Sequence, residues 1–286
     1  IFGRWNGVDN SFERANFPMG YEGGNSGVCP SQNLVEAFDM RDGTPFDWNN
    51  PDHRTKALDP LERDPRLAQT VLMNGQLFKG RRVESFTGGM NGLPKEGASP
   101  TSYYLRKHLK EDTDLTTGSA TSYQHIWPLF RYAEVLLNYA EALLEATKEP
   151  DFKGIIDNVN YTLSPREAVN MVRARVDMNP IGTAGYDAFK KRLRNERRME
   201  LAFEGHRFWD IRRWKIGSST TKLEGLAITA IENENAVEGE DMYTYSYVKK
   251  TVQERIWEDR MNYYPIQDTE LFKNHNLIQN DGWDGN

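Results

Sequence analysis

Residues 196–214 read ERRMELAFEGHRFWDIRRW, and charged side chains recur along this segment at spacings of three and four. Such spacings place opposite charges on adjacent turns of a helix, where they can pair. The pattern predicts a helix from near Asp187 to Glu204, which Gly205 weakens before a further turn or two carries Phe208 to Trp214. We interpret the charges as a structural ion-pair ladder in which carboxylates alternate with arginines: Glu196, Glu200, Glu204 and Asp210 with Arg197, Arg207 and Arg213.

Two further helices are predicted upstream of this segment. Residues 131–146 carry one narrow polar stripe and are otherwise apolar or small, as in a helix packed on most sides by other helices. The second helix opens at Ser164, a natural N-cap, with Glu167 completing a capping box, and ends near Asn179-Pro180 because a residue before proline avoids the helical region. The two form an αα-hairpin, the unit of helical repeat folds, and one hairpin cannot bury both of its faces alone.

The chain divides into three regions that differ in composition and in predicted secondary structure. Residues 1–125 are rich in glycine and loops, with a possible short strand or helix at 67–73. Residues 126–216 are helical, and residues 217–286 are mixed, with a possible strand or hairpin arm at 242–250 and a short helix capped by Asp268. Irregular stretches as long as the first region are usually functional or disordered, and its aromatic content argues against disorder.

Composition and motif spacing exclude several classes of protein. A net charge of −6 over 286 residues argues against a general nucleic-acid binder. Cys29 is the only cysteine, which rules out an intramolecular disulfide and a Cys-x-x-Cys pair. The five histidines form no helical zinc motif, and the calcium-loop-like pieces at 112–114 and 280–282 lack the glutamate that an EF-hand requires. We therefore expect neither a metal nor a cofactor.

Aromatic rings beside amides are the candidate binding residues. Sugar rings present apolar C–H faces that stack on flat aromatic surfaces, while amides hydrogen-bond the hydroxyls. The sequence places such pairs in what we expect to be loops of the first region, and the alternative is that these rings only pin the loops to the scaffold. The candidates are Trp5 with Asn6, Tyr21 with Asn25, and Trp48 with Asn49.

Four segments together closely resemble the SusD/RagB family of Bacteroidetes outer-membrane lipoproteins. They are PSQNLVEAFDM at 30–40 with RDPR at 63–66, RYAEVLLNYAEA at 131–142 with VRAR at 172–175, the segment 196–214, and YPI at 264–266 with NLIQNDGW at 276–283. The family commonly has Pro-Ile-Pro and Gly-Tyr near its C-terminus, where this chain has Pro265-Ile266-Gln267 and Gly282-Trp283.

The resemblance implies a non-enzymatic glycan-binding protein, lipid-anchored at the cell surface, that caps a SusC-like TonB-dependent outer-membrane transporter and delivers glycans to it. It implies a mainly α fold, in which tetratricopeptide-like helix pairs support an extensive loop-rich ligand face with minor β structure. Family members are roughly twice as long, so we expect residues 1–286 to be the C-terminal half, with the N-terminal half and the lipid anchor absent. The family's shared motifs belong to the scaffold and identify no ligand residue.

Three alternatives remain open at this point. Some relatives serve peptide uptake, so a peptide-binding lipoprotein of the same architecture is the second reading. A glycoside hydrolase would need two carboxylates facing one cleft, whereas carboxylates with close arginines have lowered pKa values that suit neither a general acid nor a general base. A helical-repeat scaffold for a protein partner would need a concave helical face free of loops.

Overall fold

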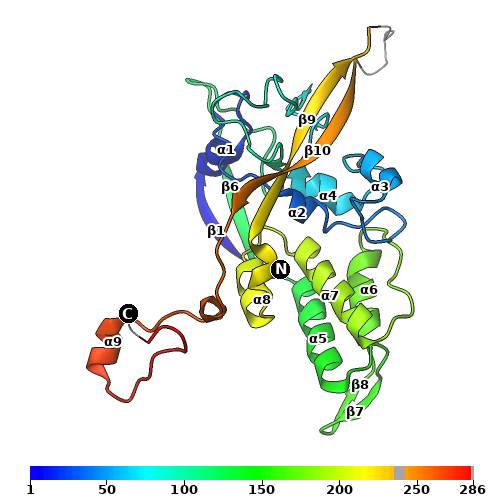
Figure 1. The fold of residues 1–286 in the computed structure, drawn as a ribbon, viewed down its shortest axis with the longest axis vertical. Coiled ribbons are helices and arrows are strands. Elements are labelled where there is room, and N and C mark those ends of the chain that lie inside the picture. The colour runs from blue at the N-terminus through cyan, green and yellow to red at the C-terminus, as the bar shows by residue number, and fades with distance from the viewer. Residues whose placement is uncertain (235–241, 285–286) are drawn as a thin grey trace.

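The computed structural model describes residues 1–234 and 242–284. Within those residues lie nine α-helices and five two-stranded sheets. Three of the helices form a block, a long β-hairpin rises beside a loop-rich region, and the C-terminal segment extends away from the rest (Figure 1). No helix in the described part of the chain is both long and apolar enough to cross a membrane.

The helical block consists of α5 (Tyr132–Thr147), α6 (Pro165–Ala174) and α7 (Tyr186–Glu200). The predicted capping box of α6 is present, since Ser164 and Glu167 bond to each other's backbone N–H groups. The connection between α5 and α6 carries a small hairpin of β7 (Gly154–Ile156) and β8 (Val159–Tyr161). The three helices enclose one apolar core, which includes Leu137, Ala140, Leu144, Val169, Phe189 and Leu193.

Helix α6 ends at Ala174, several residues before the predicted boundary at Asn179-Pro180. The chain leaves the helix through Asp177, which adopts a left-handed φ of 57°. The Arg173 Nε donates to the Asn179 carbonyl at 2.8 Å and closes this turn. The proline therefore follows the turn rather than the helix itself.

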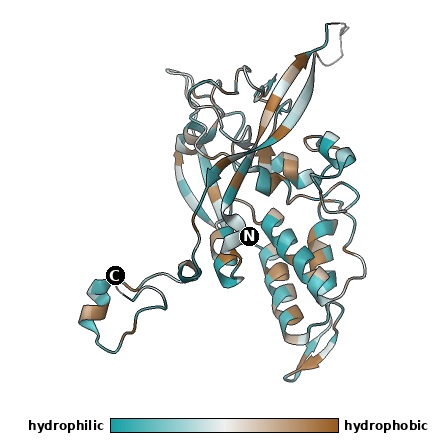
Figure 2. Cartoon of the chain, viewed as in Figure 1, coloured by the Kyte–Doolittle hydropathy of each residue, from teal (hydrophilic) through white to brown (hydrophobic). Residues whose placement is uncertain are grey.

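A long antiparallel hairpin covers the second core. Strand β10 (Tyr243–Glu254) extends the predicted strand, and β9 (Lys222–Glu232) is a partner that the sequence pattern did not indicate. Hydrophobic residues form bands along both strands between hydrophilic ones (Figure 2). The buried Leu226 and Ile228 of β9 join a core with residues of the loop region and of α7: Val35, Phe38, Leu67, Tyr103 and Met199.

The first region contains more regular structure than predicted. Strand β1 (Phe2–Asp9) pairs antiparallel with β6 (Tyr123–Phe130), so the boundary at 125/126 falls inside a strand. A third core, which includes Phe17, Tyr21, Phe78 and Tyr104, lies beneath the loops. The first region also contains short elements: α1 (Ser11–Asn16), α2 (Gln32–Val35), α3 (Pro51–Thr55), α4 (Pro65–Thr70), β2 (Val71–Leu72), β3 (Leu77–Phe78), β4 (Arg81–Arg82) and β5 (Tyr104–Leu105).

Helix α8 (Arg207–Arg213) and α9 (Asp268–Lys273) complete the helices. The predicted turns through residues 208–214 and the short helix near Asp268 are confirmed, although Gln267 rather than Asp268 is the N-cap of α9. Strands, loops and short helices make up most of the described chain outside the helical block. The predicted mainly α class therefore describes the block better than it describes the described chain as a whole. That the helix pairs of this block are tetratricopeptide-like remains a prediction.

The carboxylates of residues 196–214 do form ion pairs, but mostly not with the arginines of the predicted ladder. The Glu196 carboxylate is buried and pairs with Arg66 at 2.6 Å and with Arg173 at 2.8 Å. Asp210 pairs with Arg197 and Arg213 of the segment, each at 2.8 Å. The other pairs again join different elements: Glu200 with Arg66, Arg131 and Arg175, and Glu204 with Lys107 and Arg131. The network ties the loops to the helical block.

Acid is expected to destabilise the fold through Glu200. Burial alone would raise the pKa of Glu200, but hydrogen bonds and charges from Arg131 and Arg66 lower it from 4.5 to about 2. The stabilisation from this lowered pKa is complete above the unfolded value of 4.5 and is lost as the pH falls through about 2. We expect urea denaturation at a series of pH values to show this loss, and to show a smaller loss for Glu200→Gln. Equal pH slopes for the two proteins would contradict it.

Candidate functional site

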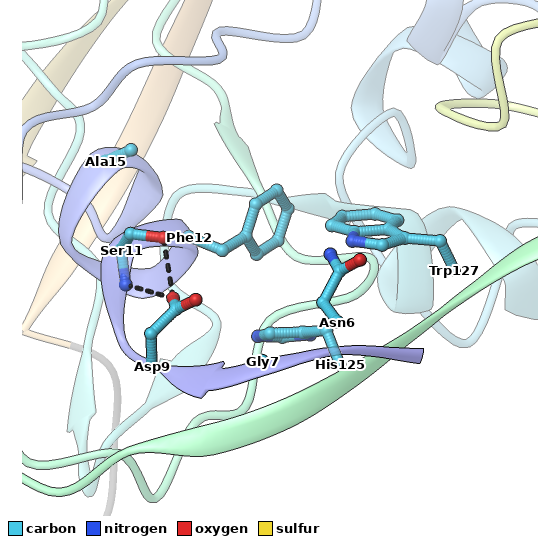
Figure 3. Close-up of a pocket in the computed structure, with 8 residues that line it drawn as sticks. All are labelled: Asn6, Gly7, Asp9, Ser11, Phe12, Ala15, His125 and Trp127. Atoms are coloured by element: carbon cyan, nitrogen blue, oxygen red, sulfur yellow. Dashed lines mark hydrogen bonds between the residues drawn. The ribbon is translucent and has the colours of Figure 1, made fainter. Parts of the chain in front are cut away.

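A pocket of about 400 Å³ opens between β1, β6 and α1 (Figure 3). The two strands belong to one antiparallel ribbon, and α1 follows β1 after a single residue. Eight residues line it: Asn6, Gly7, Asp9, Ser11, Phe12, Ala15, His125 and Trp127.

Three aromatic side chains form one wall of the pocket. His125 and Trp127 are two apart on β6, so they share a face of the strand, and their rings stack at 5.8 Å with planes 21° apart. Phe12 reaches from α1 and meets both rings edge-on, at 5.2 Å from His125 and 4.9 Å from Trp127. Phe12 and Trp127 are half-buried, which leaves part of each ring open to a ligand.

Two polar side chains stand beside these rings. The Asn6 side-chain amide makes no hydrogen bond within the described residues, while its backbone carbonyl accepts one from Gln124 at 2.9 Å. The Asp9 carboxylate accepts from the Ser11 hydroxyl at 2.6 Å and from the Ser11 backbone N–H at 2.8 Å. These bonds lower the pKa of Asp9, so it is an ionised acceptor at neutral pH. A carboxylate has room for further donors, so both side chains are able to bind hydroxyl groups.

The His125 side chain is fixed by a contact with Glu13 and is not free to react. Its ring is buried, and Nε2 lies 2.9 Å from the carboxylate Oε1 of Glu13, which is fully buried. Glu13 also accepts a hydrogen bond from the Lys110 backbone N–H at 3.1 Å. In Figure 3 the His125 ring lies beside Asn6, and the Phe12 ring points toward Trp127. The imidazole therefore serves as a fixed wall of the pocket.

The structure separates Trp5 from Asn6. Both belong to strand β1, not to a loop as predicted, and neighbouring residues of a strand point to opposite faces. Asn6 lines the pocket above, whereas Trp5 lines a second cavity of about 670 Å³ together with Lys107 and Arg131. Trp5 is 66% exposed, so its ring is open on that other face.

Tyr21 is a core residue, which corrects the expectation of an exposed ring. It is buried, packs edge-on against Phe78 at 5.0 Å, and the Arg81 guanidinium covers its ring at 3.6 Å. The ring fills apolar space beneath the loops and has no open face for a sugar. Asn25 is exposed, and its Nδ2 donates to the Arg14 carbonyl at 2.9 Å, which fixes the loop.

Trp48 and Asn49 lie in a different part of the molecule. Trp48 is half-buried against the core beneath the long hairpin, 6.3 Å from Phe46 and with the Lys249 ammonium 5.7 Å from its ring centre. Asn49 is exposed, and its backbone N–H donates to Asp47 at 2.9 Å. Trp5, Tyr21 and Trp48 thus belong to three separate packing environments.

Solved structures similar to this chain include two from Bacteroides fragilis NCTC 9343. One is a SusD-like protein, with a TM-score of 0.68 and 28% sequence identity, covering 91% of this chain and 48% of that protein. The other is a SusD-like carbohydrate binding protein, with a TM-score of 0.67 and 29% identity, covering 93% of this chain and 51% of that protein. The chain therefore spans about half the length of these two relatives.

The sequence comparisons agree with this likeness. SusD-like protein P2 of Formosa agariphila is 37% identical over 102 residues, which are 34% of this chain and 18% of that protein. The family model for the SusD family matches residues 3–283, nearly the whole of the chain. The chain is thus a member of the SusD family.

Proposed function

We propose that this protein binds glycans in the pocket between β1, β6 and α1. The observation that carries the proposal is the half-exposed Trp127 ring beside the free Asn6 amide and the ionised Asp9 carboxylate. A sugar ring needs these groups together, because its C–H face stacks on an aromatic ring while its hydroxyls bond to amides and carboxylates. The B. fragilis relative described as carbohydrate binding supports the same class of ligand.

The proposed role is binding without catalysis. Asp9 is the one carboxylate among the described residues that line the pocket, and glycoside hydrolysis in most families needs two across the scissile bond. Glu200 and Glu204 pair with cations that lower their pKa values, which makes them poor proton donors near neutral pH.

The proposed setting follows from membership of the SusD family. In it the protein is a lipid-anchored component of the outer-membrane surface, and residues 1–125 supply most of the ligand face. It hands its glycan to a SusC-like TonB-dependent transporter. Trp5, Trp48 and Asn49 remain predictions as further ligand contacts. No contact among the described residues favours the alternative of a peptide ligand.

Isothermal titration against a panel of oligosaccharides and a matched panel of short peptides tests the ligand class. We expect at least one glycan to bind with a Kd of roughly 10 μM to 1 mM, because desolvating hydroxyl groups offsets much of the stacking gain. The peptides should give no heat of binding. Binding of peptides with no glycan bound would contradict the proposal.

A further inference from the structure

A second polar pocket carries an excess of positive charge. It has a volume of about 480 Å³ and lies where α2, the end of α7, the start of α8 and the base of the β9–β10 hairpin meet. Lys222 and Arg255 come from the base of the hairpin. In the register of the two strands, Lys222 lies opposite Glu254, the residue before Arg255. Arg198 of α7 and Arg207 of α8 complete the set of cations that line it.

Within the described residues none of these four cations has a carboxylate partner. Arg207 is half-buried, and its side chain makes neither a hydrogen bond nor an ion pair with any residue of the described ranges 1–234 and 242–284. Arg198 donates only to the backbone carbonyl of Asn33, at 2.7 Å. Glu36 is the one carboxylate among the described residues that line the pocket; it accepts from Lys249 at 3.0 Å and from Gln32 at 2.9 Å, so it is already engaged.

Three buried arginines of the described residues do have partners. Arg66 and Arg173 each contact buried carboxylates. Arg63 is fully buried without a carboxylate in contact, yet it donates to backbone carbonyls of Val35, Phe38, Asp39 and Ala57. Removing a charged group from water is costly unless it is paired or hydrogen-bonded, so Arg207 lacks what the others have.

The titration of the two arginines agrees with this arrangement. Burial, followed by the charge of the neighbouring Arg207, lowers the pKa of Arg198 to about 10, although the charge of Glu36 opposes this shift. Burial also lowers the pKa of Arg207 against the opposing charge of Asp210. A bound anion would stabilise both charged forms, and a planar guanidinium fork matches the oxygens of a sulfate or carboxylate group.

We propose that this pocket is an oxyanion site, which holds a sulfate or carboxylate group carried by an acidic glycan. Only the identity of the carrier rests on the proposed glycan-binding function; the oxyanion chemistry rests on Arg198, Arg207, Lys222 and Arg255. The pocket is of a size typical for small ligands, about 300–1,000 Å³. Hydroxyl and amide groups of Ser31, Asn33, Ser219 and Thr220 line the same space and can meet the sugar.

The test is isothermal titration of the double variant Arg207→Gln/Arg255→Gln. The control is Arg54→Gln/Lys191→Gln, which removes the same charge from two exposed side chains without ion pairs among the described residues. The probes are sodium sulfate, trigalacturonate, a sulfated galactan oligosaccharide and its unsulfated counterpart. We expect the Kd for at least one charged probe to rise tenfold or more in the pocket variant and to stay within twofold in the control.

The outcomes separate the two proposals. If the pocket variant binds every charged probe as the unmodified protein does, or none of them binds to either, the oxyanion site is wrong. In that case, unchanged binding of the neutral oligosaccharide leaves the glycan function standing. If sodium sulfate binds and is lost in the variant while no oligosaccharide binds, the oxyanion site stands and its glycan carrier is wrong.

Discussion

Replacing Arg173 with methionine is expected to lower the free energy of unfolding by about 3–5 kcal/mol, the usual cost of removing one partner from a buried ion pair. The Arg173 side chain is 1% exposed. Its Nη1 lies 3.0 Å from Asp39 and 2.8 Å from Glu196, and its Nε holds the Asn179 carbonyl. Methionine fills part of the volume but leaves two buried carboxylates with one cation fewer, and the loop of Asp39 loses a tie to the helical block.

Arg41→Met is the matched control for Arg173→Met. Arg41 makes a single ion pair at 2.8 Å with Asp177, whose side chain is 94% exposed. Exposed pairs contribute little, so we expect a change below about 1 kcal/mol. Chemical denaturation of both variants measures the difference. Similar losses for Arg41→Met and Arg173→Met would show that the buried network does not connect loops and helices as described.

Replacing Trp127 with alanine is expected to weaken glycan binding at least about tenfold, equivalent to about 1.4 kcal/mol. Trp127 offers the half-exposed ring of the pocket, and His125 and Phe12 hold it in place by stacking and edge contacts. Alanine removes the stacking surface and loosens the wall behind it. Titration with a glycan found in the panel measures the loss.

Two further variants test whether an effect of Trp127→Ala comes from the loss of a ligand contact in this pocket. Asn6→Ala removes a side-chain amide that makes no hydrogen bond within the described fold, so it should keep the stability and still weaken binding. Trp5→Ala removes a tryptophan from the opposite face of the same ribbon and should weaken binding less than Trp127→Ala does. Loss of binding in Trp5→Ala with none in Trp127→Ala would place the ligand on the other face of β1.

The sequence alone predicts the helical block well, since its signals are local. A polar stripe marks α5, charges at spacings of three and four mark α7, and Ser164 with Glu167 marks the start of α6. The motifs that carry the SusD/RagB resemblance lie partly in the same helices and partly in residues 30–66, 201–214 and 264–283. The ion pairs of residues 196–214 show the limit, because spacing indicates partners on the same helix while Glu196 pairs with Arg66 of helix α4, far away in the sequence.

The candidate site could be predicted only in part for the same reason. Asn6 is recognisable in the sequence as an amide beside an aromatic residue. His125 and Trp127 lie far from it in the sequence and come close to it only because β1 pairs with β6. Pro128 lies inside β6 and argues against predicting a strand there. The alternation of His125 and Trp127 is the sequence signal that favours a strand. For Tyr21, the sequence does not distinguish an exposed ring from one buried under Arg81.

The most direct test of glycan binding at this site is a crystal structure of the protein with a bound oligosaccharide from the panel. We expect a sugar ring stacked on Trp127, with its hydroxyls bonded to the Asn6 amide and the Asp9 carboxylate. A sugar bound elsewhere, with the pocket between β1, β6 and α1 empty, would contradict the account.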